Sequence, residues 1–529
     1  MIALNKIYKT FGDRVLFNHI SLHCPEGAKV ALVGNNGAGK TSLLNIICGF
    51  DQSFDGTITC PKELRLGYLP QHPNISPASS VFDEALSGAV TVNTIQRDRD
   101  AALEAMGIDF SQELYDQYEF LEQRFVALNG YRLEEDTRDI LRGLGFSEDN
   151  WEKNPATLSG GWRMRLELAK ILLNQPNFLI LDEPTNHLDL PSIEWFELYL
   201  KSFKGTILFV SHDQDLLNRL STHTAHLRQG MLTLHKGNFE HFLEAFELQQ
   251  SQNSHKAKHF KQQMEHIQSF VDRFRYKPSK AKQVQSRLKM LTRIKVMEDD
   301  MSFESMDDTM GLSLKNPTPS GKDVITVKDL VIGYSEPLTR PMNLSVQRGQ
   351  KIAILGANGL GKSTLLRTFL GEQPALNGTA NFGHNVKYGY FAQEHLEGLD
   401  ETQTILDNVL LSAPHLKDVE ARRLLGSLGL VRDDVFKTVK LLSGGEKSRT
   451  ALACMLSKAP NTLFLDEPTN HLDISATEVL AQALSDFEGT VIFISHNRRF
   501  IQSVATHILY LKDKHQSAKD PLRIEPVED

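Results

Sequence analysis

An α/β protein made of two tandem copies of one domain, joined by a helical hairpin, is the fold that the sequence predicts. Three observations support it. First, a glycine-rich octet, an Asp-Glu pair after an apolar run, and a later histidine occur twice in the same order. Second, each octet follows an apolar run of strand length and opens an apolar helix. Third, between the copies, apolar residues recur at helical spacing on both sides of a proline.

The spacing between the copies locates an insertion in the first one. The octets 34–41 and 356–363 are 322 residues apart, and so are Gln71 and Gln393. The later motifs, including Asp182-Glu183 and Asp466-Glu467, are only 284 apart. The first copy therefore carries 322 − 284 = 38 extra residues, which we place between about 87 and 133.

Composition is that of a globular protein in a reducing compartment. Hydrophobic residues make up 40% of the 529 and charged residues 23%, which is ordinary. No apolar run approaches the roughly 18 residues that span a membrane, the N-terminus lacks a signal-peptide pattern, and the four cysteines are scattered. We expect a cytoplasmic protein without a membrane segment. A net charge of −8 disfavours nucleic-acid binding for the chain as an average.

Both octets fit the pattern G-x-x-x-x-G-K-[ST], in which backbone N–H groups and a helix N-terminus surround phosphates. Lys40 and Lys362 are expected to reach the β- and γ-phosphates of a nucleotide, and Thr41 and Ser363 to ligate Mg²⁺. The residues expected to contact nucleotide are Gly34, Asn35, Asn36, Gly37, Ala38, Gly39, Lys40, Thr41 and Ser42, and then Gly356, Ala357, Asn358, Gly359, Leu360, Gly361, Lys362, Ser363 and Thr364.

Two carboxylates follow an apolar strand in each copy. Asp182 and Asp466 end their strands, where an aspartate is well placed to hold Mg²⁺ through water. Glu183 and Glu467 come next and can orient or deprotonate an attacking water. The sequence therefore predicts two ATP-hydrolysing sites.

Further motifs resemble those of ATP-binding-cassette (ABC) ATPases. Ser159-Gly160-Gly161 and Ser443-Gly444-Gly445 look like the family signature, Leu188-Asp189 and Leu472-Asp473 its D-loops, and His212 and His496 its switch histidines. Gln71 and Gln393 resemble its Q-loops, which implies contact with nucleotide and metal. Phe11 and Tyr334 stand where the family stacks an aromatic ring on adenine. The resemblance covers roughly residues 1–245 and 322–511.

The resemblance implies that the two cassettes pack head to tail within one monomeric chain and trap two ATP molecules. Ser443 and Gly445 would complete the site of the first octet, and Ser159 and Gly161 that of the second. Both sites are complete, so both are expected to hydrolyse ATP. Trp162 departs from the family, where many cassettes have Gln or Glu after the signature, and leaves open whether the sites turn over equally.

The segment 246–321 reads as a basic linker. Its apolar stripes, Met264 to Phe274 and Val284 to Ile294, predict two helices, and Pro278 stops the first. From 255 to 297 there are 12 Lys and Arg against two acids, a charge that favours phosphate backbones.

Residues 270–287 closely resemble the linker of ABC family F, whose members bind ribosomes. That resemblance implies a factor that enters the ribosomal E site when ATP-closed, reaches the P-site tRNA and the peptidyl-transferase region, contacts rRNA, and leaves after hydrolysis. The residues expected to contact RNA are Arg273, Arg275, Lys277, Lys280, Lys282 and Arg287.

The insertion at 87–133 has the opposite charge. Apolar residues from Leu103 to Phe125 suggest a second helical hairpin, and its position resembles the family's arm. Residues 97–125 hold eight acids and three bases, a charge that repels rRNA. We expect packing on its own cassette or contact with a basic ribosomal protein. Residues 512–529 are expected to be a short acidic tail, frayed from Pro521 onward.

Two other classes of function remain open from the sequence. One is the ATPase half of a transporter with a separate membrane subunit, and the other is a DNA-repair ATPase. The basic hairpin argues against the first. The lack of zinc modules and of very long coiled coils argues against the second.

Overall fold

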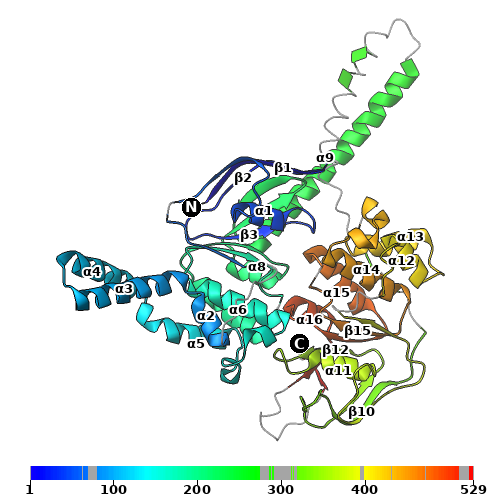
Figure 1. The fold of residues 1–529 in the computed structure, drawn as a ribbon. Helices are drawn as coiled ribbons and strands as arrows, with labels where there is room; N and C mark the ends of the chain where they lie inside the picture. Colours follow the sequence, from blue (N-terminus) through cyan, green and yellow to red (C-terminus); the bar gives the residue numbers. More distant parts are fainter. Residues whose placement is uncertain are drawn as a thin grey trace.

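The computed structural model contains two α/β domains of the same topology; the first precedes the linker along the chain and the second follows it (Figure 1). The structure describes residues 2–12, 14–61, 63–69, 80–186, 188–274, 285–286, 289–290, 311–312, 314, 318–392, 398–430, 432–470, 472–511 and 524–527.

The first domain is built on two sheets. The larger one has the order β5-β6-β7-β3-β8-β9. Its strands are β3 (Lys29–Val33), β5 (Leu66–Leu69), β6 (Phe178–Asp182), β7 (Thr206–Val210), β8 (His223–Arg228) and β9 (Met231–Lys236). Pairing is parallel except between β8 and β9. The smaller sheet is antiparallel and comprises β1 (Ala3–Phe11), β2 (Arg14–His23) and β4 (Asp55–Thr59).

The second domain repeats both sheets strand for strand. Its larger sheet has the order β14-β15-β16-β12-β17-β18 and its smaller one β11-β10-β13. The strands are β10 (Asp323–Val331), β11 (Met342–Gln347), β12 (Lys351–Leu355), β13 (Asn377–Phe382), β14 (Tyr388–Phe391), β15 (Thr462–Asp466), β16 (Thr490–Ile494), β17 (His507–Tyr510) and β18 (Ile524–Pro526). The duplication seen in the sequence is thus a duplication of topology.

Helices cover the larger sheets, so that their central strands are buried along their whole length. This burial explains why those strands are continuous apolar runs and not alternating ones. The helices of the first domain are α1 (Lys40–Ile47), α2 (Val81–Ser87), α5 (Leu133–Gly143), α6 (Gly160–Leu173), α7 (Leu190–Ser202) and α8 (Gln214–Leu220). Those of the second are α11 (Lys362–Phe369), α12 (Ile405–Ser412), α13 (Asp418–Ser427), α14 (Gly444–Ser457), α15 (Ile474–Asp486) and α16 (Arg498–Val504).

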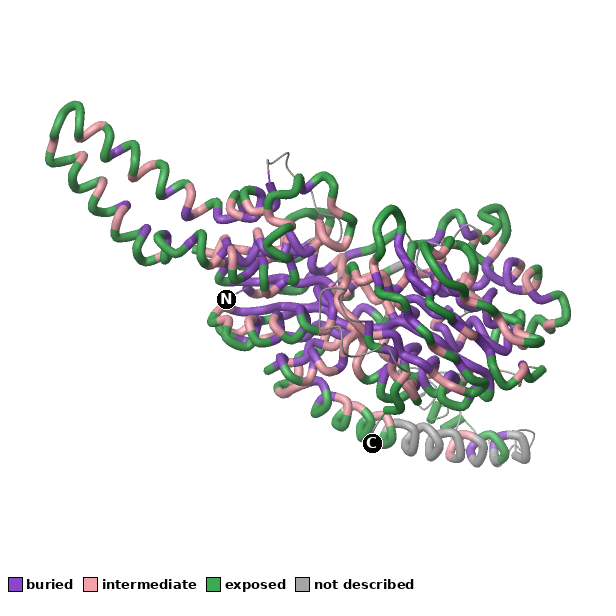
Figure 2. Tube along the Cα trace, turned by 90° about the horizontal axis from the view of Figure 1, so that it is seen from below, coloured by how far each residue is buried: buried purple, intermediate pink, exposed green. Residues whose placement is uncertain are grey.

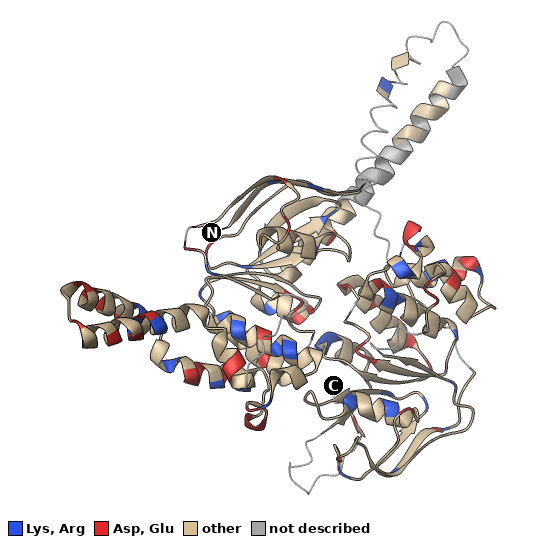
Figure 3. Ribbon diagram, in the orientation of Figure 1, with Lys and Arg blue, Asp and Glu red and all other residues tan. Residues whose placement is uncertain are grey.

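Between α2 and α5 the first domain carries a projecting helical hairpin, α3 (Val90–Ile108) and α4 (Gln112–Ala127) (Figures 1 and 2). In the described segment 398–430 of the second domain, α12 is followed directly by α13. Only the base of the hairpin packs on its own cassette, through buried Val92, Ile95, Leu121 and Phe125. The expected packing on the cassette is therefore wrong for the outer part. Acidic residues are frequent along the hairpin (Figure 3).

The linker begins as α9 (Phe239–Phe274), a helix of 36 residues that projects from the first domain (Figure 1). At 1.5 Å per residue it is about 54 Å long. Phe239 and Phe242 are buried in the core of the first domain and anchor its first turns. The predicted turn at 276–279 and most of the second arm lie outside the described residues.

The expectation of a frayed C-terminal tail is wrong for Ile524–Pro526. These residues form β18, which pairs antiparallel with β17 just as β9 pairs with β8 in the first domain. The strand was missed because it is only three residues long and has no alternating apolar pattern. Its place is set by backbone hydrogen bonds along the edge of the sheet.

Candidate nucleotide sites

In both domains the glycine-rich loop joins a central strand to a helix. Gly39 precedes α1 and Gly361 precedes α11, both with positive φ (103° and 88°) that glycine adopts without strain. Neither helix has a side-chain cap, so its first N–H groups face the loop. Lys40 Nζ donates to the carbonyl of Gly34 (2.7 Å), and Lys362 Nζ donates to that of Gly356 (2.7 Å). Each loop therefore wraps a buried lysine, as a phosphate cradle requires.

In each larger sheet, the strand that ends in the predicted metal ligand lies two positions from the strand that precedes the glycine-rich loop. Its C-terminal end therefore lies near that loop. Asp182 ends β6, is buried, and accepts a hydrogen bond from Thr41 Oγ1 at 2.8 Å. Burial, together with the charge of Glu183, raises the pKa of Asp182. Two adjacent oxygen donors at the end of a phosphate loop fit Mg²⁺, which keeps waters and phosphate oxygens as further ligands. Asp466 is likewise buried at the end of β15.

The predicted catalytic glutamates follow directly and are held in an uncommon backbone conformation. Glu183 and Glu467 have φ of 50° and 49°. The Glu183 N–H donates to the carbonyl of Val210 at the end of β7, and the Glu467 N–H to that of Ile494 at the end of β16. Local strain of this kind persists only where neighbouring structure fixes it. Here a strand end fixes it, next to the phosphate loop.

Each glutamate contacts the predicted switch histidine. The His212 N–H donates to Glu183 Oε2 (3.1 Å), and His212 Nε2 lies 3.3 Å from Glu183 Oε1. The distance between His496 Nε2 and Glu467 Oε1 is also 3.3 Å. Burial raises the pKa of Glu183 to about 7 and lowers that of His496 to about 3. It raises the pKa of Glu467 and lowers that of His212 likewise. The imidazoles are therefore neutral at pH 7.

The two signature serines are held differently. Ser443 is the N-cap of α14, and its hydroxyl and N–H both bond Glu446 in a capping box. Ser159 is the N-cap of α6 but makes no side-chain capping bond. The residue in the position of Glu446 is Trp162, which packs against Phe146 with ring centroids 4.8 Å apart. The departure noted in the sequence thus changes the capping of one signature helix.

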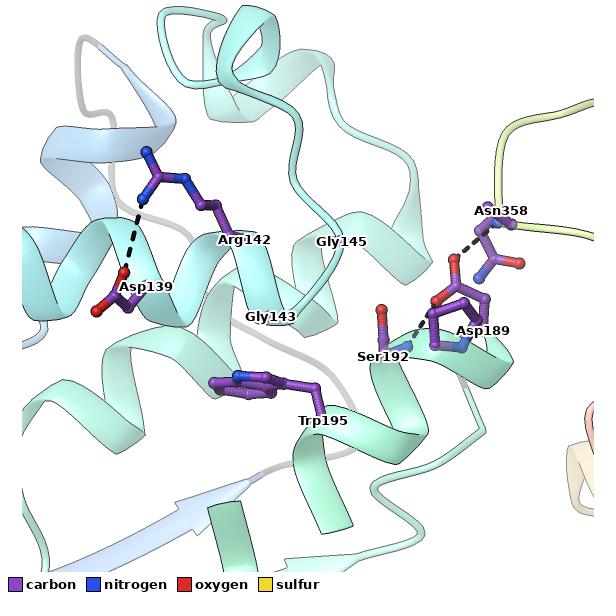
Figure 4. Close-up of a pocket in the computed structure, with 10 residues that line it drawn as sticks. Asp139, Arg142, Gly143, Gly145, Asp189, Ser192, Trp195 and Asn358 are labelled. Carbon is purple, nitrogen blue, oxygen red and sulfur yellow. Dashed lines mark hydrogen bonds and ion pairs between the residues drawn. The ribbon is translucent and has the colours of Figure 1, made fainter. Parts of the chain in front are cut away.

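The domains touch at the second phosphate loop (Figure 4). The Asn358 N–H donates to Asp189 Oδ2 of the first domain at 2.8 Å. Asp189 also caps α7 by accepting from the Ser192 N–H (3.2 Å). A pocket lies beside this contact, between α5, α7 and the second loop. The D-loop of one cassette therefore lies against the nucleotide loop of the other.

A buried arginine that sequence reasoning missed supports this D-loop. Arg165 in α6 donates to the Leu144 carbonyl (2.8 Å) and lies 3.6 Å from Asp189 Oδ2. Its counterpart Arg449 in α14 donates to the carbonyl of Gly429 (3.1 Å). The signal was present in the sequence, because 449 − 165 = 284, the offset of the neighbouring motifs.

Other predicted residues are exposed or lie beyond the described part. Phe11 ends β1 and Tyr334 follows β10; they are 79% and 61% exposed, so each ring is free to meet a base. Gln71 and Gln393 lie outside the described residues. Arg273 belongs to α9, but its side chain is not described, and the remaining expected RNA contacts are outside the described residues: Arg275, Lys277, Lys280, Lys282 and Arg287.

Comparisons with known proteins agree with the geometry. The family model described as ABC transporter matches residues 17–186 and 339–470, and a second model of the same description matches 225–308. The uncharacterized ABC transporter ATP-binding protein YfmM of Bacillus subtilis is 34% identical over 96% of this chain and 97% of its own length. ABC transporter F family member 5 of Arabidopsis thaliana is 32% identical over 97% of this chain and 75% of its own.

Among solved structures, a complex of archaeal ribosomal stalk protein aP1 with the archaeal ribosome recycling factor aABCE1 has the same twin-domain fold. The TM-score is 0.60 at 18% identity, covering 98% of this chain and 89% of that one. In the described part of the chain, no helix combines the length and the apolar character needed to cross a membrane.

Proposed function

We propose that this chain, which belongs to the ABC transporter family and within it to the F-type twin-cassette ATPases, acts on the ribosome. The observation that carries the proposal is α9. The helix is about 54 Å long, and its outer part, which projects from the first cassette, begins a segment, 255–297, with 12 Lys and Arg against two acids. A protein with net charge −8 that gathers positive charge in one segment of its linker is suited to a phosphate backbone.

Bound ATP would hold the two cassettes together in the closed state. The first phosphate loop would be completed by Ser443 and Gly445, and the second by Ser159 and Gly161. The bond between Asp189 and Asn358 supports this arrangement, because it already joins a D-loop to the opposite phosphate loop. When bound, Mg²⁺ would be held by Thr41 and Asp182 and by Ser363 and Asp466, with the Q-loop glutamines, and would neutralise phosphate charge.

Hydrolysis would release the clamp. Glu183 and Glu467 would each take a proton from the attacking water, and the neutral histidine beside each would position the carboxylate. Loss of the γ-phosphate removes the contacts that hold the cassettes together.

The closed protein would occupy the ribosomal E site, with the linker tip against the P-site tRNA near the peptidyl-transferase centre. Its arginines and lysines would contact RNA phosphates, which position a protein and give little sequence readout. Binding should therefore weaken as salt rises.

The hairpin α3–α4 would contact a different kind of partner. Its outer part is acidic and exposes apolar side chains near the turn, including Ile108 (86% exposed) and Phe110 (65%). A basic ribosomal protein with an apolar contact site fits this surface, whereas rRNA does not.

The test is to block hydrolysis and retain binding. Glu183→Gln with Glu467→Gln keeps the hydrogen-bonding shape of both sites but removes the bases. The double variant should co-sediment with ribosomes in ATP and not in ADP, and the association should fall steeply between 50 and 200 mM salt, by roughly a thousandfold if about six phosphates are contacted. Lys40→Ala with Lys362→Ala is the matched control, because it should abolish ATP-dependent binding. Absence of ATP-dependent co-sedimentation of the Glu→Gln variant would contradict the proposal.

A further inference from the structure

The two cassettes meet a second time, away from the nucleotide loops, where α8 contacts α16. Arg499 Nε lies 3.1 Å from Asp215 Oδ1. Arg498 Nη2 lies 2.9 Å from Glu194 Oε1 on α7, and Gln214 Nε2 donates to Glu478 Oε1 on α15 at 2.7 Å. Arg499 also donates to Gln214.

The repeat offset shows which of these contacts are equivalent. Arg498 is the counterpart of Gln214, and Glu478 is the counterpart of Glu194, because 498 − 214 = 284 and 478 − 194 = 284. The contacts Arg498–Glu194 and Gln214–Glu478 therefore join the same two positions of the repeat, with the two domains exchanged. In contrast, 499 − 215 = 284, so Asp215–Arg499 joins one position to its own counterpart. A position that meets its own counterpart lies on the two-fold axis of a symmetric pair. Asp215 and Arg499 therefore mark the approximate two-fold axis between the cassettes.

Opposite charges at this axis can exist only because the two cassettes differ. If the first cassettes of two chains paired in the same way, the carboxylates at position 215 would face each other. If two second cassettes paired, the guanidinium groups at position 499 would face each other. Like charges in contact disfavour the wrong partner. Only the pairing of a first with a second cassette is attractive at the axis.

The place of Arg499 in its helix supports a role across the interface. It is the second residue of α16, a helix with an asparagine N-cap and no acidic residue in its first turn. A cation at a helix N-terminus is disfavoured by the helix dipole, whereas Asp215 at the same place in α8 is favoured. The contacts that favour Arg499 come from the other cassette. Asp215 is 19% exposed and Arg499 46%, so the pair is at the interface and only partly screened.

We propose that Asp215 and Arg499 are specificity-determining residues, which favour pairing of a first with a second cassette and oppose pairing of two like cassettes. This inference rests on the proposed closure of the cassettes by ATP, and not on the ribosome as partner.

The experiment reverses each charge and then exchanges the two. In the full chain carrying Glu183→Gln and Glu467→Gln, closure in ATP is followed by energy transfer between dyes on the two cassettes, without ribosomes. Asp215→Arg or Arg499→Asp alone should raise the ATP concentration for half-closure roughly 5- to 30-fold, because an attraction becomes a repulsion. The exchange Asp215→Arg with Arg499→Asp should restore it to within about 3-fold, and the single-variant defect should shrink at 1 M salt.

Glu194→Gln is the matched control, since it removes a charge from an off-axis pair whose glutamate is 65% exposed, and it should change half-closure less than 2-fold. Equal defects in the exchanged and single variants would overturn the proposal, as would single variants that close like the parent. Failure of the parent itself to close in ATP would instead contradict the proposed function, so the two failures are distinguishable.

Discussion

The residues expected to act on nucleotide belong to motifs whose spacing recurs in the two copies. Lys40, Thr41, Asp182 and His212 come together at the carboxyl ends of neighbouring parallel strands, where the topology places them. The link between Asp189 and Asn358 could not be predicted in the same way. It joins residues of two domains, and nothing in the spacing within one domain specifies how two domains meet.

The raised pKa of the glutamates leads to a prediction about pH. A carboxyl group must be ionised to accept a proton from water, and burial raises the pKa of Glu183 to about 7 and that of Glu467 further. The kcat/KM for ATP, which reports on the free enzyme, should therefore fall as pH decreases from about 8 to 6. The lowered histidine pKa values predict no second inflection between pH 5 and 8.

Measurement of kcat/KM against pH checks this, with Glu183→Gln as a companion. That variant leaves only Glu467, whose pKa of about 8 is the higher, so its midpoint should move upward. A profile that is flat from pH 6 to 9 would show that another step limits kcat/KM.

At the scale of the element, the linker shows what periodicity can and cannot predict. The apolar stripe before Pro278 correctly predicted a long helix, and α9 is that helix.

The apolar stripe proposed for the insertion was only partly right. Phe125 and Leu121 are buried, but Leu103 is 52% exposed. Arg99 instead stacks over the Phe125 ring at 4.3 Å, and Ala102 takes the buried position. A prediction based on apolar residues alone does not detect a long cationic side chain that covers an apolar ring.

The base of α9 gives a prediction about stability. Phe242 is 4% exposed and packs against Phe239, Phe246, His226 and His235. Phe242→Ala should lower the free energy of unfolding of the first cassette by about 3–5 kcal/mol through the lost burial and the cavity. Thermal or denaturant unfolding measures this. Leu248→Ala, on the same helix but 62% exposed, should change it by less than about 0.5 kcal/mol. Similar losses in both variants would mean that α9 is not anchored at Phe242.

For the whole molecule, the broken offset of the repeat predicted two domains, an insertion and a linker in the right order along the chain. The pairing of charges at the axis between the cassettes needed the structure, because Asp215 and Arg499 look like ordinary surface residues in the sequence.

The projecting hairpin allows the ATPase to be separated from the proposed ribosome contact. Replacing residues 103–117 by a short Gly-Ser turn removes the exposed end and keeps the buried base. ATPase activity without ribosomes should stay within about 2-fold, whereas the affinity of the Glu→Gln variant for ribosomes should fall by about 10-fold, or 1.4 kcal/mol. Co-sedimentation measures the affinity. Unchanged affinity would contradict a partner at the hairpin.

The small strand β18 has a consequence for how the protein can be shortened. A chain cut after Leu511, where the motifs of the second cassette end, would lose Ile524–Pro526 and leave β17 at the edge of its sheet. An uncovered edge presents free N–H and C=O groups to any other chain in solution. Such a truncation would keep all the residues expected to act in catalysis and yet make the protein more prone to aggregate.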